Sequence, residues 1–181
     1  MDTRTTLLDH AEMLARTRGF EAFSFADLAT ALDMRKASVH YHFSTKAALA
    51  QALIRRYRES FMARLALIDA PEADDRLRAY IALYRETLGS GDRLCLCVAF
   101  SCSRDSFDAA VGAEIHGFHR DSLNWLADVF ALGQIDETLP NADPAGAAYA
   151  CLALCEGAQI MARAAGEAHV FDRATAQILK G

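Results

Sequence analysis

The sequence predicts an all-α protein of about nine helices. Only 3 of its 181 residues are proline, Ala and Leu are abundant, and no segment alternates between apolar and polar side chains as a half-buried strand would. A chain of this length accommodates a small domain attached to a larger one. We therefore predict an N-terminal three-helix helix-turn-helix domain over residues 1–46, which a long helix joins to a larger helical bundle over residues 47–181.

The first two helices are marked by their apolar spacing and by their end residues. The first is expected over residues 7–18, where apolar side chains recur at helical spacing at Leu7, Leu8, Ala11, Leu14 and Ala15. Gly19 follows and suits the left-handed conformation that commonly ends a helix. Ser24 is the expected N-cap of the second helix, and Asp27 three residues later forms a weaker version of the capping box.

The third helix is expected over residues 35–43, after a break in the apolar period. Its spacing directs Val39 and Phe43 inward and Tyr41 outward. Basic, hydroxyl and aromatic side chains are concentrated in this helix. Two short helices joined by a tight turn, with such side chains on the second, are typical of a helix-turn-helix DNA reader.

Six further helices are expected from the spacing of apolar residues, over residues 44–68, 72–88, 93–102, 105–132, 144–165 and 170–179. Asp143 and Pro144 suit the N-cap and the first position of the eighth helix. Small residues that would allow close helix approach recur along it, at Ala147, Ala148, Ala150, Ala153, Gly157 and Ala158. Packing within one chain explains them, and so does a two-fold homodimer built from the seventh and eighth helices.

Charge is distributed unevenly along the chain. The formal net charge is −5, yet residues 1–64 hold 10 Lys and Arg against 7 Asp and Glu, whereas residues 65–181 hold 9 against 17. Residues 35–64 hold 7 basic side chains and 1 acidic side chain. A basic end on an acidic chain is the electrostatic footprint expected of contact with nucleic-acid phosphates.

The sequence also indicates a compartment. We find no signal peptide at the N-terminus and no run of 18 or more apolar residues that suggests a membrane span, so we expect a cytoplasmic protein. The five cysteines are an odd number in a chain without export signals. They are therefore interpreted as thiols rather than as a disulfide framework.

The segment SVHYHFSTK, from Ser38 to Lys46, resembles the DNA-binding domain of the TetR family of transcriptional repressors. The likeness covers roughly residues 3–60, and its most specific part is the aromatic and basic run 41–43 followed by Lys46. Met34 and Ala37 depart from the usual pattern of the turn and the third helix. The resemblance implies a cytoplasmic homodimer that represses transcription and leaves its double-stranded DNA operator when a small-molecule effector binds the second domain.

The candidate DNA-binding residues are Arg4, Ser24, Arg35, Lys36, Ser38, His40, Tyr41, His42 and Lys46. The two basic residues at the start of the third helix could donate to O6 and N7 of guanine. By resemblance, Tyr41, His42 and Lys46 chiefly contact phosphates. A solvated terminal charge is the competing interpretation for Arg4, and a structural histidine is the competing interpretation for His42.

The candidate effector-binding or sensing residues are Tyr80, Tyr84, Cys95, Cys97, Phe100, His116, His119, Trp125 and Glu156. Aromatic walls with polar tips suit a small-molecule pocket among the fifth, sixth, seventh and eighth helices. The segment 94–100 also resembles a branch of the family typified by NemR-like electrophile-responsive repressors and by acrylate-responsive relatives. That likeness implies a sensor at Cys95 or Cys97, with inert core cysteines as the alternative.

No metal, cofactor or catalytic residue is predicted. The spacing of Cys95, Cys97 and Cys102 is not that of a zinc site, and His116 and His119 share a helix face without a supporting acidic pattern. We find no G-x-S-x-G, H-E-x-x-H, P-loop or G-x-G-x-x-G motif. A constitutive DNA-binding protein without an effector, or a small α-helical enzyme or carrier, remain the alternatives.

Overall fold

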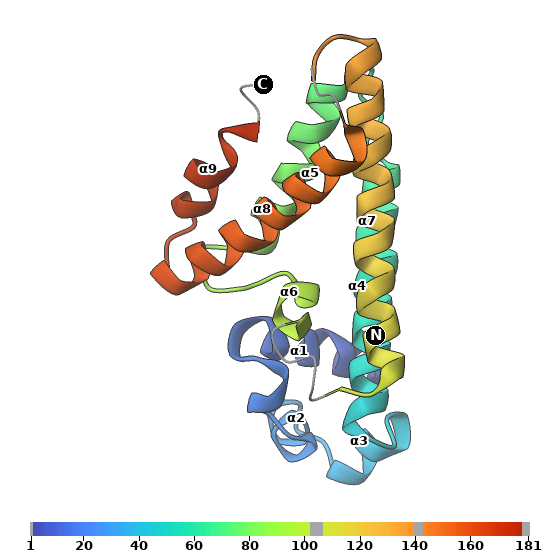
Figure 1. The fold of residues 1–181 in the computed structure, drawn as a ribbon. Coiled ribbons are helices and arrows are strands. Elements are labelled where there is room, and N and C mark those ends of the chain that lie inside the picture. Colours follow the sequence, from blue (N-terminus) through green and yellow to red (C-terminus); the bar gives the residue numbers. More distant parts are fainter. Residues whose placement is uncertain (1, 102–106, 140–142, 179–181) are drawn as a thin grey trace. The chain divides into compact units, whose positions relative to one another are not determined.

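The computed structural model describes residues 2–101, 107–139 and 143–178, and within these ranges every regular element is helical (Figure 1). The α-helices span Thr3–Arg18 (α1), Phe25–Ala31 (α2), Lys36–His42 (α3), Lys46–Ala66 (α4), Ala73–Thr87 (α5), Leu96–Ser101 (α6), Ala109–Ile135 (α7), Pro144–Ala165 (α8) and His169–Thr175 (α9), and a 3-10 turn (η1) spans Phe20–Ala22. The predicted all-α class is confirmed, with nine α-helices in the described ranges.

The chain forms two compact units. Unit 1 comprises Met1–Glu59 and Leu96–Gly117, and unit 2 comprises Ser60–Cys95 and Phe118–Gly181. The long helices α4 and α7 each contribute to both units. The units are defined by contacts in space rather than by order in the sequence. Unit 1 therefore includes α6 and the start of α7 in addition to the first three helices. The functional boundary expected after residue 46 stays a prediction.

The start of α2 is fixed by the predicted capping box. The backbone N–H groups of Ala26 and Asp27 donate to Ser24 Oγ at 3.2 and 3.3 Å, and the backbone N–H of Ser24 donates to Asp27 Oδ2 at 2.7 Å. These bonds satisfy N–H groups that the first helical turn leaves without a partner. At Gly19, which ends α1, φ is 93°, a value that favours glycine.

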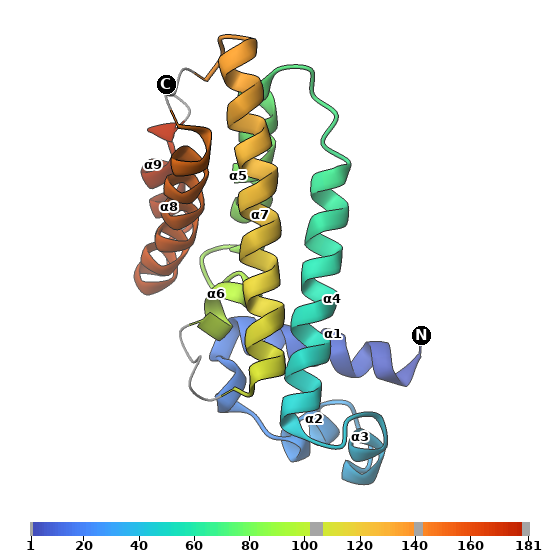
Figure 2. The same cartoon turned by 45° about the vertical axis from the view of Figure 1, so that its right-hand side comes forward.

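Helix α6 packs on the N-terminal helices of unit 1, where Figure 2 shows it beside α1. The Phe100 ring lies 5.0 Å from the Phe20 ring and stacks on the Phe107 ring at 4.7 Å, measured between centroids. Phe20 and Phe100 are both buried. An aromatic cluster therefore joins α6 to the segment that connects α1 to α2.

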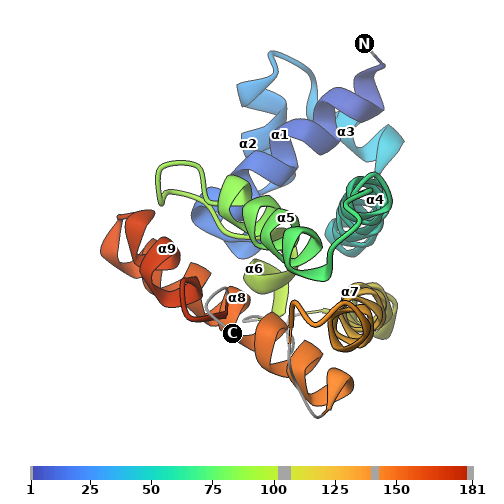
Figure 3. The ribbon, with the colours of Figure 1, turned by 90° about the horizontal axis from the view of Figure 1, so that it is seen from above.

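In unit 2, α8 packs along α9 and against α5 (Figure 3). The buried side chain of Gln159 on α8 accepts from the backbone N–H of Cys95 at 2.7 Å. It also donates to the backbone carbonyl of Tyr84 at 2.9 Å and to Thr87 Oγ1 at 2.7 Å. One amide thereby ties the end of α5 and Cys95 to α8.

Several helix ends differ from the sequence prediction. Helix α6 begins at Leu96, three residues later than expected, and α4 ends at Ala66 rather than near residue 68. Helix α7 continues to Ile135, beyond the expected end at residue 132. The expected start of the seventh helix at residue 105, and the expected ends of the sixth and ninth helices at residues 102 and 179, lie outside the described residues.

Helix α8 has one buried and one exposed face. By length and composition it could cross a membrane, with a mean hydropathy of 1.2 over 18 residues, although 39% of that window is buried. The core helix of a soluble protein passes the same test, so the match is weak evidence of a span. The apolar side chains of Tyr149, Ile160 and Met161 are exposed on it at 65%, 46% and 59%.

Candidate nucleic-acid interface and effector region

Helix α3 presents polar and aromatic side chains on a buried apolar base. Val39 is fully buried and Phe43 is 3% exposed, whereas Tyr41 exposes 86% of its surface. Arg35 is the extended N-cap, with φ −75° and ψ 140°, and Lys36 begins the helix. The predicted inward and outward directions along this helix are confirmed.

A hollow of about 510 Å³, which we call the α2-side hollow, lies within unit 1. It is lined by Glu21, Ala22, Phe23, Ser24, Phe25, Asp27, Lys36, His40, Thr45 and Lys46. The His40 ring meets the Phe25 ring edge-on at 4.9 Å. Four predicted DNA-binding residues therefore meet here, with a hydroxyl group, an imidazole and two ammonium groups.

Lys46 is already engaged in this hollow. Its Nζ lies 3.1 Å from Glu21 Oε2, and 4.8 and 5.5 Å from the ring centroids of Phe20 and Phe23. The ammonium is thus held over two aromatic faces, an arrangement stabilised by the ring quadrupoles. An incoming phosphate would have to compete with the Glu21 carboxylate for this cation.

A second hollow of about 370 Å³, which we call the α1-side hollow, also lies within unit 1. It is lined by Arg4, Leu8, His42, Phe43, Ala48, Gln51, Ala52, Arg55, Arg56 and Glu59. The Arg4 guanidinium lies 5.2 Å from the centroid of the Phe43 ring. Arg4 and His42, which are 38 positions apart in the sequence, are therefore brought to one surface.

Several residues of these surfaces were not predicted from the sequence. Gln51 and Arg55 extend the α1-side hollow along α4, and the i, i+4 spacing that puts them on one helix face was visible in the sequence. Glu114 on α7 accepts from Arg55 Nε at 2.8 Å and from Arg58 Nη1 at 3.3 Å. No sequence signal indicated that long-range pairing of α7 with α4.

Aromatic rings predicted for an effector pocket meet in unit 2. Tyr80 stacks on Trp125, with centroids 5.5 Å apart and an interplanar angle of 17°, and lies 5.2 Å from Tyr84. Phe61 meets Tyr84 edge-on at 5.5 Å and Phe118 at 5.1 Å. Helices α4, α5 and α7 all contribute to this cluster. Tyr80 and Tyr84 are fully buried.

A histidine and a carboxylate form a polar pair beside these rings. His119 Nε2 lies 2.9 Å from Glu156 Oε1, and the two side chains are 26% and 22% exposed. The hydrogen bond from His119 to the Glu156 carboxylate raises the pKa of His119, while partial burial acts in the opposite direction. The pair therefore favours imidazolium beside carboxylate, in which each charge is balanced by the other.

The described cysteines carry buried thiol side chains. Cys95, Cys97, Cys151 and Cys155 are all buried. The hydrogen bond with Cys151 is the main cause that raises the pKa of Cys155, with burial second. Cys102 and Arg104 lie outside the described residues. Because the thiolate is the reactive form, burial disfavours reaction at these four sites.

Two further predicted effector residues belong to unit 1. Phe100 packs against Phe20 and Phe107, as described above, and His116 is exposed on α7. Tyr80, Tyr84, Cys95, His119, Trp125 and Glu156 belong to unit 2, whereas Cys97 belongs to unit 1 with these two residues. The predicted set is thus divided between the two units.

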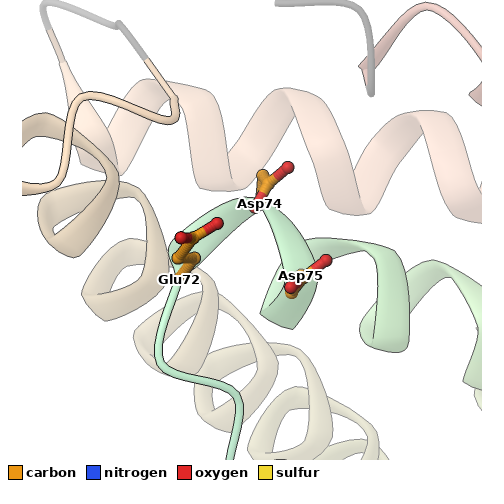
Figure 4. A group of neighbouring side chains, drawn as sticks. All are labelled: Glu72, Asp74 and Asp75. Carbon is orange, nitrogen blue, oxygen red and sulfur yellow. The ribbon is translucent and has the colours of Figure 1, made fainter.

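Three carboxylates cluster at the start of α5 (Figure 4). Oxygens of Glu72, Asp74 and Asp75 lie within 4.8 Å of one another. The backbone N–H of Asp74 donates to Thr138 Oγ1 at 3.3 Å, and Arg78 donates to Asp74 Oδ2 at 3.2 Å. Acidic residues in the first turn are favoured by the helix dipole, which accounts for the cluster.

Comparison with known proteins identifies the N-terminal segment. A family model described as bacterial regulatory proteins, tetR family, matches residues 7–53. A transcriptional regulator of the TetR family from Agrobacterium tumefaciens is 26% identical, with a TM-score of 0.92 over 98% of this chain and 95% of that chain. These matches support a TetR-family transcriptional regulator.

Two other solved structures share the TetR fold. The reduced form of NemR from E. coli is 24% identical, with a TM-score of 0.83 over 98% of this chain and 95% of that chain. AibR, solved in complex with isovaleryl coenzyme A and operator DNA, is 20% identical, with a TM-score of 0.71 over 88% of this chain and 86% of that chain. A comparison with functionally curated proteins found no match. The TetR-family regulator fold points to a DNA-binding regulator rather than an enzyme.

Proposed function

We propose that this TetR-family protein is a cytoplasmic, homodimeric repressor that binds an operator through α3 and leaves it when a small molecule binds unit 2. The observation that carries the DNA-binding part is the pair of hollows beside α3. Lys36 and His40 line one hollow, and His42 and Phe43 line the other. Tyr41 lies between them in sequence and is almost fully exposed.

This arrangement matches the shape of the major groove. His40 and His42 lie about 200° apart around the helix axis, since each residue turns a helix by about 100°. A helix in the major groove has a phosphate backbone on either side. We assign the α2-side hollow to one backbone and the α1-side hollow to the other, with Arg35, Lys36 and Ser38 reading base edges.

A two-fold dimer supplies the second reading head. One recognition helix reads only a few base pairs, and paired half-sites about 34–36 Å apart multiply specificity. The exposed apolar side chains of Tyr149, Ile160 and Met161 on α8 support a dimer interface there. On α7, Ile135 is 80% exposed. We propose that α8 forms most of the interface and that α7 borders it.

We propose a noncovalent effector rather than an electrophile. Cys95 and Cys97 are both 0% exposed, and a reactive cysteine must be accessible and ionised. The likeness to NemR is a likeness of fold alone and does not by itself support an electrophile sensor in this chain. AibR was solved with both a coenzyme A thioester and operator DNA, which supports a small-molecule effector for this chain. Release then follows if the effector favours a conformation in which the two reading heads no longer fit the operator.

The DNA-binding proposal is tested by matched variants. Fluorescence anisotropy would measure binding of the dimer to duplex DNA that flanks its coding region, at several salt concentrations. Tyr41→Ala and Lys46→Ala should weaken binding, and Lys46→Ala should reduce the salt slope by about 1. Arg173→Ala, which removes an exposed cation from α9, is the control. Unchanged DNA binding by both Tyr41→Ala and Lys46→Ala would refute the assignment.

A further inference from the structure

Three hydroxyl groups in unit 2 are buried without a hydrogen-bond partner among the described residues. They are Tyr80 Oη and Tyr84 Oη on α5 and Ser122 Oγ on α7, and all three side chains are 0% exposed. Buried polar groups in folded proteins nearly always have a partner. Three unsatisfied hydroxyls in one aromatic cluster therefore require an explanation.

The three hydroxyls are close enough to influence one another. Burial is the main cause that raises the pKa of Tyr80 well above its ordinary value. The Tyr84 and Ser122 hydroxyls act in the opposite direction as weak donors to Tyr80, but none of these contacts has the geometry of a satisfied hydrogen bond. Burial also raises the pKa of Tyr84. Both phenols are thus protonated at neutral pH, and each of the three groups can donate one hydrogen bond and accept others.

The surroundings of these hydroxyls are aromatic. Trp125 stacks on Tyr80 from one side, and Phe61 meets both tyrosine rings edge-on. Small-molecule sites typically combine apolar and aromatic walls with a few polar groups that fix the ligand's orientation. The cluster has both parts.

The charges near the cluster are balanced. Glu156 is the charged group that acts on Tyr84, and it is paired with His119 at 2.9 Å. The other ionisable neighbours of Tyr80 and Tyr84 are Cys95, Cys151 and Cys155. An anionic or cationic ligand would therefore meet no unpaired countercharge among these groups, and burying an unpaired charge is strongly unfavourable.

We propose that unit 2 binds an uncharged, oxygen-bearing organic molecule, such as a ketone, an alcohol or a phenol, whose oxygen accepts hydrogen bonds from two of the Tyr80, Tyr84 and Ser122 hydroxyls while the third donates to one of the other two. This inference rests on the proposed function, since it names the chemical class of the effector. The apolar body of the ligand packs against Trp125 and Phe61, which opens the contact between α5 and α7. Because the ligand satisfies hydroxyls that have no partner in the free protein, it favours the opened conformation.

A series of ligands that share a benzene ring separates oxygen binding from apolar binding. Acetophenone and 1-phenylethanol carry a neutral oxygen, isopropylbenzene carries none, benzoate is an anion and benzylamine is a cation. Thermal unfolding of the full-length protein would be followed with each compound at millimolar concentration. The two oxygen compounds should raise Tm, and the other three should raise it much less. Equal shifts with isopropylbenzene would overturn the proposal.

Variants that remove one hydroxyl test the same site. Tyr80→Phe, Tyr84→Phe and Ser122→Ala should leave Tm of the free protein unchanged or raise it, because the lost hydroxyl had no partner. Each should weaken acetophenone binding by about threefold to tenfold. Ser90→Ala removes an exposed hydroxyl of unit 2 outside the proposed dimer interface and is the control. Loss of stability in the free Tyr80→Phe and Tyr84→Phe variants would overturn the proposal, since an enclosed water would then already satisfy those hydroxyls.

Measurements of DNA binding distinguish a failure of the ligand proposal from a failure of the proposed DNA-binding function. The ligand measurements need no DNA, so they decide the chemical class by themselves. Release of flanking DNA by acetophenone, with retention of DNA by the Tyr84→Phe variant under the same conditions, would link the site to regulation. Specific DNA binding without any effect of the oxygen compounds on Tm or on release would overturn the inference and leave the DNA-binding proposal standing.

Discussion

Lys46 Nζ lies 3.1 Å from Glu21 Oε2, so a cation proposed to bind phosphate is already paired in the free protein. Glu21 lies in η1, and Lys46 begins α4. Their side chains are 55% and 32% exposed, which makes this a surface ion pair of modest strength. On the proposed function, DNA binding would exchange the carboxylate for a phosphate, so Glu21 would oppose DNA binding.

Removal of the competing carboxylate should tighten DNA binding. Glu21→Gln leaves Lys46 free, and we expect affinity to rise by up to about fivefold at low salt, the limit set by a surface pair. The gain should shrink at high salt because screening weakens the original pair. Glu137→Gln removes the same charge from an exposed position in unit 2 and should have little effect. Equal gains in both variants would mean that net charge, rather than the Lys46 pair, is responsible.

The capping box at α2 should contribute to the stability of the reading head. Ser24→Ala removes the acceptor for two backbone N–H groups, and we expect a loss of about 1 kcal/mol, measurable by urea unfolding. The hydrogen bonds from Ser24 lower the pKa of Asp27. The associated stability is present above the ordinary carboxyl pKa and is lost as pH falls through the lowered value. Asp27→Asn should remove that part of the acid dependence, and a variant with the wild-type profile would contradict this account.

The His119 pair should make stability depend on pH in the opposite direction. Because Glu156 raises the pKa of His119, the stabilisation is complete below the unfolded-state pKa of about 6.5. It is lost as pH rises through the higher folded-state value. Urea unfolding from pH 6 to pH 9 should show this loss in wild type and not in Glu156→Gln. His116→Gln, at an exposed site on the same helix, should keep the wild-type profile.

The exposed apolar face of α8 should control dimerisation. Met161→Glu places a charge on the proposed interface, where burial without a partner is unfavourable. Sedimentation velocity should show monomers, and operator affinity should fall with the loss of paired reading heads. Leu67→Glu changes an apolar residue that is 81% exposed outside α7 and α8, and it should remain dimeric. A dimeric Met161→Glu protein would exclude this face.

The buried thiols should resist electrophiles in the folded protein. In a Cys102→Ser background, N-ethylmaleimide should modify Cys95, Cys97, Cys151 and Cys155 far more slowly in native protein than in urea, because all four are buried. DNA binding should survive brief treatment. Rapid release that the additional substitution Cys97→Ser prevents would instead establish that residue as the sensor.

Local sequence patterns predicted the helices and their caps, whereas the long-range side-chain pairs depend on tertiary contacts that local patterns do not reveal. The Ser24 capping box follows from a spacing of three residues, and the burial of Val39 follows from helical period. By contrast, Glu21 meets Lys46 across 25 positions, and Arg55 meets Glu114 across 59. Such pairs depend on how helices pack, and charge composition alone does not select them.

The buried hydroxyls of unit 2 also depend on tertiary packing that the sequence does not reveal. The sequence indicated Tyr80 and Tyr84 as aromatic residues with polar tips, but Ser122 is one of several serines with no distinguishing pattern. Its importance depends on full burial beside the two tyrosines. Gln159 is similar, because its three hydrogen bonds reach residues 64 to 75 positions away.

The central claim is that α3 and its two flanking hollows read a specific operator. The most direct test compares anisotropy of the wild-type protein on duplex DNA that flanks its coding region with a shuffled duplex of identical composition, at one stated salt concentration. We predict a dimer that prefers the flanking DNA by at least about 10³-fold. Equal affinity for the two duplexes would contradict sequence-specific regulation at this site.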